Sequence, residues 1–232
     1  DNLYHNKADH LYPLTASGEE DYESPYALWI DGIRATILDI LDGGRISLPH
    51  FDFKTGVRHD NAVVLDVPEN GVVIIEGLHA LNPVMLPSDL APEAVFKLFV
   101  CPLLPLNLDL HNRIPSSYLR LLRRIVRDYR YRGYSALETI ARLSSVQRGE
   151  DRWIAPFQEE ADVMFNSALL FELAVLKRHA EPILDEVPKY CDEYTTAHRL
   201  KKYLSYFESI SEREIPPTSF LREFVGGSSF SY

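Results

Sequence analysis

An unbroken run of β-branched residues at 72–75 (VVII) constrains the fold more than any other feature of the sequence. Strands with one solvent-exposed face alternate apolar and polar residues, whereas continuous apolar runs are typical of strands buried on both faces, mostly in parallel sheets. The run stops abruptly at Glu76-Gly77, as a strand does at the edge of a sheet. We therefore predict a buried parallel strand at 72–75.

Strand and helix patterns alternate along the rest of the chain. We expect an extended piece at residues 46–53 and strands at 62–67, 95–100 and 162–165. One helix is expected to begin at Ser24-Pro25 and to end at Gly43-Gly44, because these residues are typical of helix starts and helix ends. Further helices are predicted at 117–130, 167–180 and 195–208. This alternation indicates an α/β fold with a mostly parallel sheet flanked by helices.

The composition is that of a globular protein, with 46% hydrophobic and 25% charged residues. We expect a single domain over residues 1–232, in which 190–232 form a helical C-terminal extension. The two cysteines, Cys101 and Cys191, show no CxxC pattern, which excludes a cysteine-rich zinc site and favours a reducing, cytoplasmic location. No apolar run approaches the roughly 18 residues of a membrane-spanning helix, so no membrane partner is expected.

Positive charge is concentrated in one part of an acidic chain. The net charge is −10, yet residues 113–152 hold ten arginines, no lysine and four acidic residues. Arginine presents a planar fork that binds phosphate oxygens in pairs, which lysine does not. The acidic remainder disfavours a nucleic-acid partner. The cluster therefore suggests one small anionic ligand rather than a long polyanion.

Within this window, Arg120, Arg124 and Arg127 share one face of the predicted helix. Asp128 stands at helical spacing from Arg124 and from Arg132, so it can pair with either. A solvated amphipathic face is the usual explanation of a charge run. Because this run has one sign and consists of arginine alone, we favour phosphate binding.

Two acidic positions are candidates for ligand contacts. Glu76 follows the predicted strand at the edge where open α/β sheets bind ligands, and it suits a Mg²⁺ ion near phosphates. The alternative is a carboxylate on a surface loop, and the position at the strand end favours the ligand role modestly. Asp52 stands between Phe51 and Phe53, where it could line a pocket for a flat or polyol ligand or mark a packed strand edge. The histidines show no metal-binding spacing, and the phosphate-binding motif GxxxxGK[ST] does not occur.

Taken in order, these pieces resemble the phosphoribulokinase/uridine kinase family of P-loop kinases, and most closely bacterial uridine kinase-like proteins. The matching stretches are DNLY at 1–4, LPHFDFKTGVR at 48–58, VVIIEGLHALNP at 72–83, RLLRRIVRDYRYRG at 120–133 and ADVMFNS at 161–167. The resemblance implies a P-loop NTPase-like fold whose first strand and P-loop are missing from this chain. We therefore expect an N-terminally truncated piece of a larger protein.

The resemblance also implies roles for individual residues. Asp1 matches the family's general base, with a contact to Mg²⁺, and Glu76 matches its Walker-B-like metal ligand. Arg127 and Arg132 match the arginines that contact the phosphates of ATP. The substrate-side positions of the family fall on Glu23, which would hold ribose hydroxyls, and on Phe51, Asp52, Arg58, Arg124 and Arg142. The implied cofactors are ATP and Mg²⁺.

Three positions depart from the family pattern. Gly56 stands where pyrimidine-specific uridine kinases have a histidine, and Arg142 stands where they have a glutamine that reads the base. Tyr134 replaces a second phosphate-binding arginine. Uracil recognition therefore does not carry over, and Arg142 favours a phosphorylated or otherwise anionic acceptor.

The resemblance implies an ATP-dependent kinase domain that transfers the γ-phosphoryl group to a sugar hydroxyl of a nucleoside. Without a P-loop, the chain by itself is expected to be inactive. The alternatives are a phosphoribulokinase that acts on a sugar phosphate, a non-catalytic nucleotide- or RNA-binding domain, and a scaffold domain without a ligand. The expected partner is a nucleoside or sugar-phosphate acceptor, and a homo-oligomer is compatible with the sequence.

Overall fold

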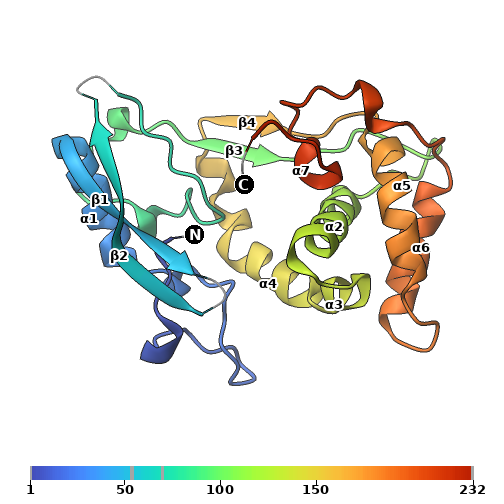
Figure 1. Ribbon diagram of the computed structural model, residues 1–232, viewed down its shortest axis with the longest axis horizontal. Helices are drawn as coiled ribbons and strands as arrows, with labels where there is room; N and C mark the ends of the chain where they lie inside the picture. The colour runs from blue at the N-terminus through green and yellow to red at the C-terminus, as the bar shows by residue number, and fades with distance from the viewer. Residues whose placement is uncertain (1, 53–54, 69–70, 231–232) are drawn as a thin grey trace. The chain divides into compact units, whose positions relative to one another are not determined.

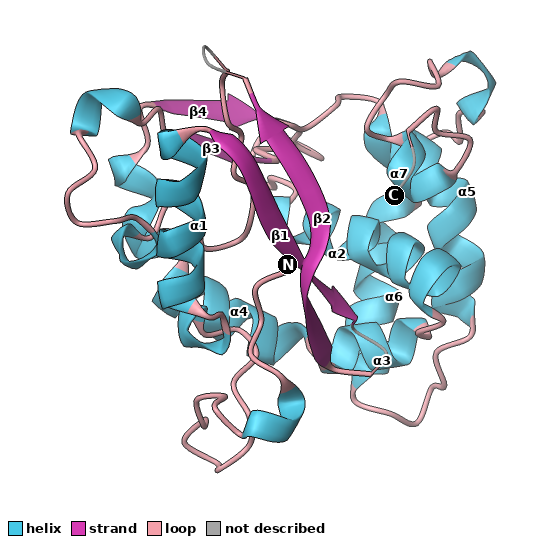
Figure 2. Ribbon diagram, turned by 60° about the vertical axis from the view of Figure 1, so that its left-hand side comes forward, coloured by secondary structure: helices cyan, strands magenta, loops and turns pink. Residues whose placement is uncertain are grey.

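A computed structural model describes residues 2–52, 55–68 and 71–230 of the protein (Figure 1). Helices and short strands are mixed along the chain, which confirms the α/β class (Figure 2). In chain order the elements are α1 (Ile30–Asp42), β1 (Gly44–Asp52), β2 (Val57–Val67), β3 (Leu98–Cys101), α2 (Ser116–Arg127), α3 (Ala136–Ala141), α4 (Leu143–Trp153), β4 (Val163–Asn166), α5 (Glu172–Asp185), α6 (Glu193–Leu204) and α7 (Arg222–Val225).

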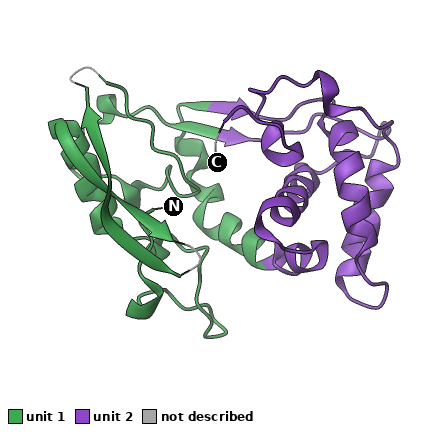
Figure 3. Ribbon diagram, in the orientation of Figure 1, with its two compact units in different colours: residues 1–99, 145–163 green, residues 100–144, 164–232 purple. Residues whose placement is uncertain are grey.

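The chain forms two compact units (Figure 3). The first unit consists of residues 1–99 and 145–163, and the second of residues 100–144 and 164–232. The chain passes from one unit to the other within β3, α4 and β4. A single domain over residues 1–232 stays a prediction.

In the first unit, the helix predicted to begin at Ser24 begins later. The Ser24 hydroxyl accepts a hydrogen bond from the main-chain N–H of Tyr26, as a helix cap does, but the capped turn is a short 3₁₀ helix, Pro25–Ala27. Trp29 then donates its main-chain N–H to the carbonyl of Leu3 at 2.7 Å, so this stretch is extended. The α-helix α1 therefore starts only at Ile30, and it ends before Gly43 as predicted.

The core of the first unit forms where α1 packs on a later loop. Ile33 and Ile37 lie one helical turn apart on α1 and contact the buried side chain of Met85. β1 and β2 form an antiparallel pair, with an irregular register between Leu48 and His50. Pro49 stands at this irregularity, where a strand tolerates proline because no ladder hydrogen bond is lost.

The prediction that residues 72–75 form a buried strand is wrong. These residues form no strand, and the side chains of Val72 and Ile74 are 89% and 87% exposed. A strand of this kind needs neighbours that satisfy its backbone groups and cover its two faces. No described residue pairs with this segment, so its apolar side chains face solvent.

Two other predicted strands form, displaced by a few residues. The main-chain N–H of Asp162 donates to the carbonyl of Lys97, and that of Ser167 donates to Cys101. Residue numbers increase in the same direction along both segments, from 97 to 101 and from 162 to 167, so β3 and β4 run parallel. Among the described residues, however, the sheets are this parallel pair and the antiparallel β1–β2 pair, so the mostly parallel sheet of the prediction is not found.

The second unit is a helical core built on α2. The buried face of this helix is formed by Leu119, Leu122, Ile125 and Val126. α5 and α7 both pack against α2, and α6 packs against α5. The residues predicted as a C-terminal extension contribute Leu200, Leu204 and Leu221 to this core. In the described part of the chain, no helix has the length and apolar character needed to cross a membrane.

Candidate functional site

Three predicted acceptor-side residues gather around Tyr4 in the first unit. The rings of Tyr4 and Phe51 have centroids 5.5 Å apart, and the main-chain carbonyl of Tyr4 accepts a hydrogen bond from Nη1 of Arg58 at 3.2 Å. Burial raises the pKa of Tyr4, and the negative charge of Glu23 raises it further. Glu23, Phe51 and Arg58 are therefore neighbours of a single tyrosine.

Arg58 is held in place by several neighbours. Its guanidinium lies 4.1 Å from the ring centroid of Trp29, its Nε donates to Asp60 at 3.0 Å, and its side chain is only 13% exposed. Its main-chain N–H donates to the side-chain carbonyl of Asn6 at 2.7 Å. These contacts fasten β2 to the N-terminal segment. A direct contact between Arg58 and an acceptor stays a prediction.

Asp52, the last residue of β1, is hydrogen-bonded to the residues that precede β2. Its carboxylate accepts a hydrogen bond from the Thr55 hydroxyl at 2.9 Å, and its carbonyl accepts one from the N–H of Gly56 at 2.7 Å. Gly56 has a φ of +71°, which favours glycine, and the histidine of uridine kinases would be strained there. Phe53, the third member of the predicted triplet, lies outside the described residues.

Glu23 lies directly against Gly149 of α4, within the first unit. A Cβ atom added to Gly149 would stand 2.5 Å from Cβ and 3.0 Å from Cγ of Glu23. Only a residue without a side chain allows this approach. The main-chain N–H of Glu23 also donates to the carboxylate of Asp21 at 3.2 Å. The position of this carboxylate therefore depends on a glycine about 125 residues away in the sequence.

We predict that Gly149→Ala weakens acceptor binding. The added methyl group must displace the Glu23 side chain, and a displacement of about 1 Å near a reacting group can cost on the order of 10²-fold in rate. The Michaelis constants for acceptor and ATP, measured separately on a form extended upstream to include a P-loop, check this. Ser145→Ala, on the same helix but exposed, is the control. An unchanged acceptor constant would contradict the role of Glu23.

His79 is buried next to the same acid. The residue is 8% exposed, and its Nδ1 atom has no hydrogen-bond partner among the described residues. Burial lowers its pKa below the usual 6.5, although the nearby main-chain groups of Glu23 and Trp153 act in the opposite direction. The sequence around this histidine shows no metal-binding spacing. Its position between the Glu23 loop and the end of α4 was not predictable from spacing.

We predict that stability falls as the pH falls below about 6.5. A histidine whose pKa is lowered by folding stays neutral in the folded protein and takes up a proton more readily when unfolded. Burial lowers the pKa of His79 and also that of His179. Urea unfolding between about pH 5 and 8 should show this loss, and His79→Gln should reduce its slope. The exposed control His111→Gln should leave the slope unchanged.

The predicted metal ligands do not form a cluster in the described structure. Glu76 lies in an exposed segment, and no described residue forms a hydrogen bond or ion pair with its carboxylate. No group of three or more histidine, cysteine or acidic residues in the described ranges could hold a metal ion. Asp1 lies outside those ranges. A hard carboxylate oxygen beside phosphates still fits Mg²⁺, which typically binds one or two carboxylates and keeps several waters.

In the second unit, the arginine-rich helix ends in an unusual turn. α2 stops at Arg127, and residues Asp128–Arg132 form one π-helical turn that Gly133 closes in a left-handed conformation. π-Helical turns are rare and are often found at functional sites. We call residues 127–133 the arginine turn. Arg124 lies one helical turn before it on α2 and is half-buried.

Asp128 connects the two predicted phosphate-binding arginines. Its Oδ1 atom lies 3.1 Å from Nε of Arg127 and 3.5 Å from Nη1 of Arg132. The pairing of Asp128 with Arg132, predicted from helical spacing, is thus confirmed. Arg127 and Arg132 remain 27% and 55% exposed, so a ligand can reach both.

Arg142 and Tyr134, two of the three departures from the family pattern, stack on each other. The guanidinium carbon of Arg142 lies 4.3 Å from the ring centroid of Tyr134, and Arg142 is exposed. The nearby carboxylate of Glu138 is occupied by the capping box that starts α3 at Ser135. Arg142 therefore adds another exposed positive charge close in sequence and structure to the arginine turn.

A buried ion pair that sequence reasoning missed anchors α2. Arg123 donates through Nε and Nη2 to the two carboxylate oxygens of Glu172, and through Nη2 to the carbonyl of Ser167 at 2.9 Å. The rings of Phe220 and Phe224 lie 5.2 Å and 5.5 Å from its guanidinium carbon. Glu172 is fully buried. The available signal was a lone acid within the otherwise apolar stretch ALLFELAVL.

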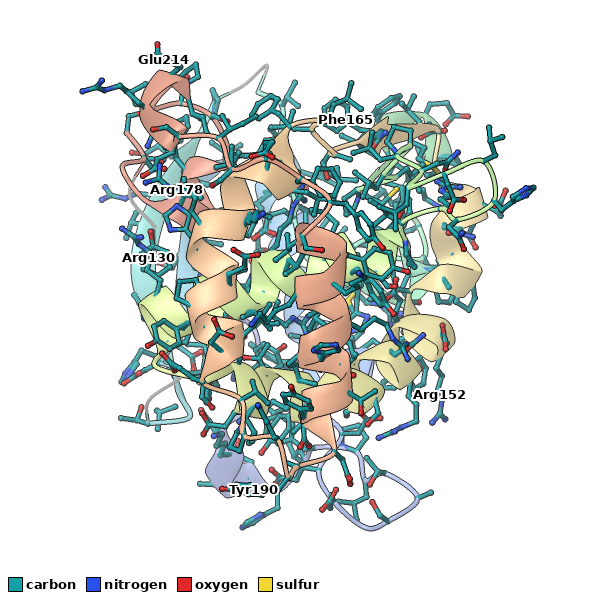
Figure 4. The ribbon with its side chains drawn as sticks, turned by 90° about the vertical axis from the view of Figure 1, so that its right-hand side faces the viewer. Arg130, Arg152, Phe165, Arg178, Tyr190 and Glu214 are labelled. Carbon is teal, nitrogen blue, oxygen red and sulfur yellow. The ribbon has the colours of Figure 1, made fainter. Side chains whose placement is uncertain are left out.

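The C-terminal segment also contacts the arginine turn. A Cβ atom on Gly226 would stand 2.2 Å from Nη2 of Arg130, so the two residues touch. Arg130 and Arg178, both labelled in Figure 4, lie near His179, where their positive charges help to lower the pKa of this histidine. The main-chain carbonyl of Gly226 accepts a hydrogen bond from Arg222. This packing restrains Arg130 in the turn.

The predicted site residues are divided between the two units. Glu23, Phe51, Asp52, Arg58 and Glu76 belong to the first unit. The second unit contains Arg124, Arg142 and the arginine turn. Among the described residues of the first unit, Glu23, Phe51 and Arg58 are brought near one residue, Tyr4. The convergence of all the predicted residues on one ligand stays a prediction.

Comparison with known proteins connects these residues to a family. Residues 14–170 match the model of the Phosphoribulokinase / Uridine kinase family. The chain is 28% identical over 166 residues to a uridine kinase of Halobacterium salinarum, which covers 71% of this chain and 64% of that protein. It is 27% identical over 147 residues to the uridine kinase of Staphylococcus aureus strain JH9, or 63% of this chain and 62% of that protein.

The chain thus spans slightly less than two thirds of the length of these curated relatives. The family match covers the residues that position Glu23, the β1–β2 hairpin, Glu76 and the arginine turn. The protein therefore belongs to the phosphoribulokinase/uridine kinase family.

Proposed function

We propose that this protein is part of an ATP-dependent kinase that transfers the γ-phosphoryl group of ATP to a sugar hydroxyl of a nucleoside. The observation that carries the proposal is the arginine turn, in which one buried acid holds the half-buried guanidinium of Arg127 and the exposed guanidinium of Arg132. Two such groups side by side suit a polyphosphate, whose oxygens accept paired hydrogen bonds. Membership of the family supports the same reaction class.

Phosphoryl transfer depends mainly on positioning and on neutralising charge. Arg127 and Arg132 would bind phosphate oxygens and stabilise the charge that develops in the transition state. Glu23, held against Gly149, would accept hydrogen bonds from the ribose hydroxyls. Glu76 would hold Mg²⁺, which neutralises phosphate charge when bound. Asp1 would accept the proton of the attacking hydroxyl.

A second candidate acceptor is a sugar phosphate. The exposed Arg142, stacked on Tyr134, supports it, because a guanidinium is better suited to an anionic group than to a neutral base. Uridine and ribulose 5-phosphate, compared as acceptors in one assay, distinguish the two candidates. Faster turnover of the sugar phosphate, together with its loss in Arg142→Gln, would favour the second.

The test is an ATP-consumption assay on the 232-residue chain and on a form extended upstream to include a P-loop. The chain contains no GxxxxGK[ST] motif, so we expect it to be inactive by itself and the extended form to be active. Turnover by the chain alone would show that the missing motif is dispensable. No turnover by the extended form with any sugar acceptor would overturn the proposed function.

A further inference from the structure

Asp128 is an unusual acid in this protein because it is buried. It is 6% exposed, and the only other buried carboxylate in the described part of the chain is Glu172, which Arg123 neutralises. A buried charge is costly unless it is paired and hydrogen-bonded. Asp128 meets this requirement through Arg127 and Arg132. Burial therefore holds the Asp128 carboxylate in place, whereas the side chains of both arginines remain accessible to solvent.

The geometry of the two ion pairs leaves donors available. Arg127 is held through Nε, and neither of its terminal nitrogens has a partner among the described residues, so both can bind another acceptor. Arg132 is held through Nη1, so Nη2 and Nε are left. Both contacts use the same carboxylate oxygen of Asp128, which therefore brings the two guanidinium groups close together. The negative charge of Asp128 balances one of the two positive charges and so reduces the repulsion between Arg127 and Arg132.

The main chain of Asp128 fixes the same turn. Its carbonyl accepts a hydrogen bond from the N–H of Gly133, which caps the π-helical turn, and another from Tyr134 at 3.2 Å. The residue thus determines both where the turn ends and how two of its side chains are oriented. A change of the carboxylate to an amide would leave the main-chain bonds in place and remove only the charge.

We infer that Asp128 is a positioning residue that holds Arg127 and Arg132 as one paired site for a polyphosphate chain, such as the triphosphate of a nucleotide. This inference rests on the proposed function and deepens it, because it assigns the spacing of the two arginines to Asp128 and makes that assignment testable by itself. Asp128 does not touch the phosphates. It acts by presenting the outer edges of two guanidinium groups to neighbouring phosphate oxygens, in an orientation set before the ligand binds.

Asp128→Asn tests the inference because two explanations predict opposite changes in the affinity for anions. If the acid merely reduces the local positive potential, its removal strengthens the binding of anions. If it positions the arginines, its removal weakens binding, by roughly tenfold to 10²-fold. Asp185→Asn is the matched control, because this exposed acid pairs with Lys201 on neighbouring helices of the same unit. The probe is inorganic tripolyphosphate, titrated calorimetrically into the 232-residue chain.

We expect weaker binding by Asp128→Asn and no weakening by Asp185→Asn. Unchanged or tighter binding by Asp128→Asn would overturn the positioning role and leave the proposed function intact, provided that Arg127→Ala still weakens binding. No binding by the unmodified protein would overturn the paired site, whereas the proposed function is tested separately by turnover of the extended form. Thermal unfolding is measured in parallel. If Asp128→Asn does not fold, Asp128→Glu serves instead, because it keeps the charge but shifts the oxygen, and unchanged binding by it would equally overturn the inference.

Discussion

Replacing Glu172 by alanine is expected to lower the free energy of unfolding of the second unit by about 3–5 kcal/mol. Glu172 is fully buried and accepts two hydrogen bonds from Arg123. Its removal leaves the Arg123 guanidinium, whose side chain is 12% exposed, without a counter-charge. Urea unfolding, followed by circular dichroism, measures the loss.

The double variant Arg123→Met/Glu172→Leu separates the cost of an unpaired charge from the value of the pair. Two apolar residues of similar volume leave no buried charge, and such replacements are often neutral or stabilising. We therefore expect the double variant to recover most of the loss. If Glu172→Ala unfolds at the urea concentration of the unmodified protein, the ion pair contributes little to the stability of α2 and α5.

Under the proposed function, Arg127→Ala is expected to lower the turnover number of a form extended to include a P-loop by about 10²–10³-fold. Arg127 is held by Asp128 through Nε, and its terminal nitrogens would contact the phosphoryl group while it is transferred. Interactions that strengthen in the transition state affect the turnover number more than the Michaelis constant. Steady-state kinetics with ATP and a nucleoside measure both constants.

Arg148→Ala is the control, because this exposed arginine belongs to the same basic window and lies on α4. It should leave the turnover number within about twofold of the unmodified enzyme, since surface substitutions away from a site have small effects. Equal losses in both variants would indicate a general electrostatic effect. If Arg127→Ala keeps the turnover number of the unmodified enzyme, Arg127 does not stabilise the transition state.

Local signals in the sequence predicted local structure well. Gly43 ends α1 because its φ of 78° is one that other residues rarely adopt. The pattern of residues 46–67 predicted two extended segments, but not that they pair as β1 and β2. The start of α1 was missed because Trp29 hydrogen-bonds to Leu3, a contact that no helix-start signal encodes. The strand at 72–75 failed for a similar reason, since a buried strand depends on partners elsewhere.

The same distinction applies to the candidate site. The link between Asp128 and Arg132 follows from helical spacing and was predicted, whereas the π-helical form of the turn was not. The Arg123–Glu172 pair joins residues 49 positions apart, so no local pattern indicates it. The contact of Glu23 with Gly149 spans an even longer separation. Sequence patterns thus identified the charged groups but rarely their partners.

The solvent-facing VVII segment has a consequence for the behaviour of the protein in solution. Its main-chain groups lack sheet partners among the described residues, and its side chains are apolar and β-branched. Such segments add readily to one another as intermolecular strands. Concentrated samples should therefore become turbid on storage. The negative charge of Glu76, the nearest charged residue after the run, would oppose fibril growth by electrostatic repulsion.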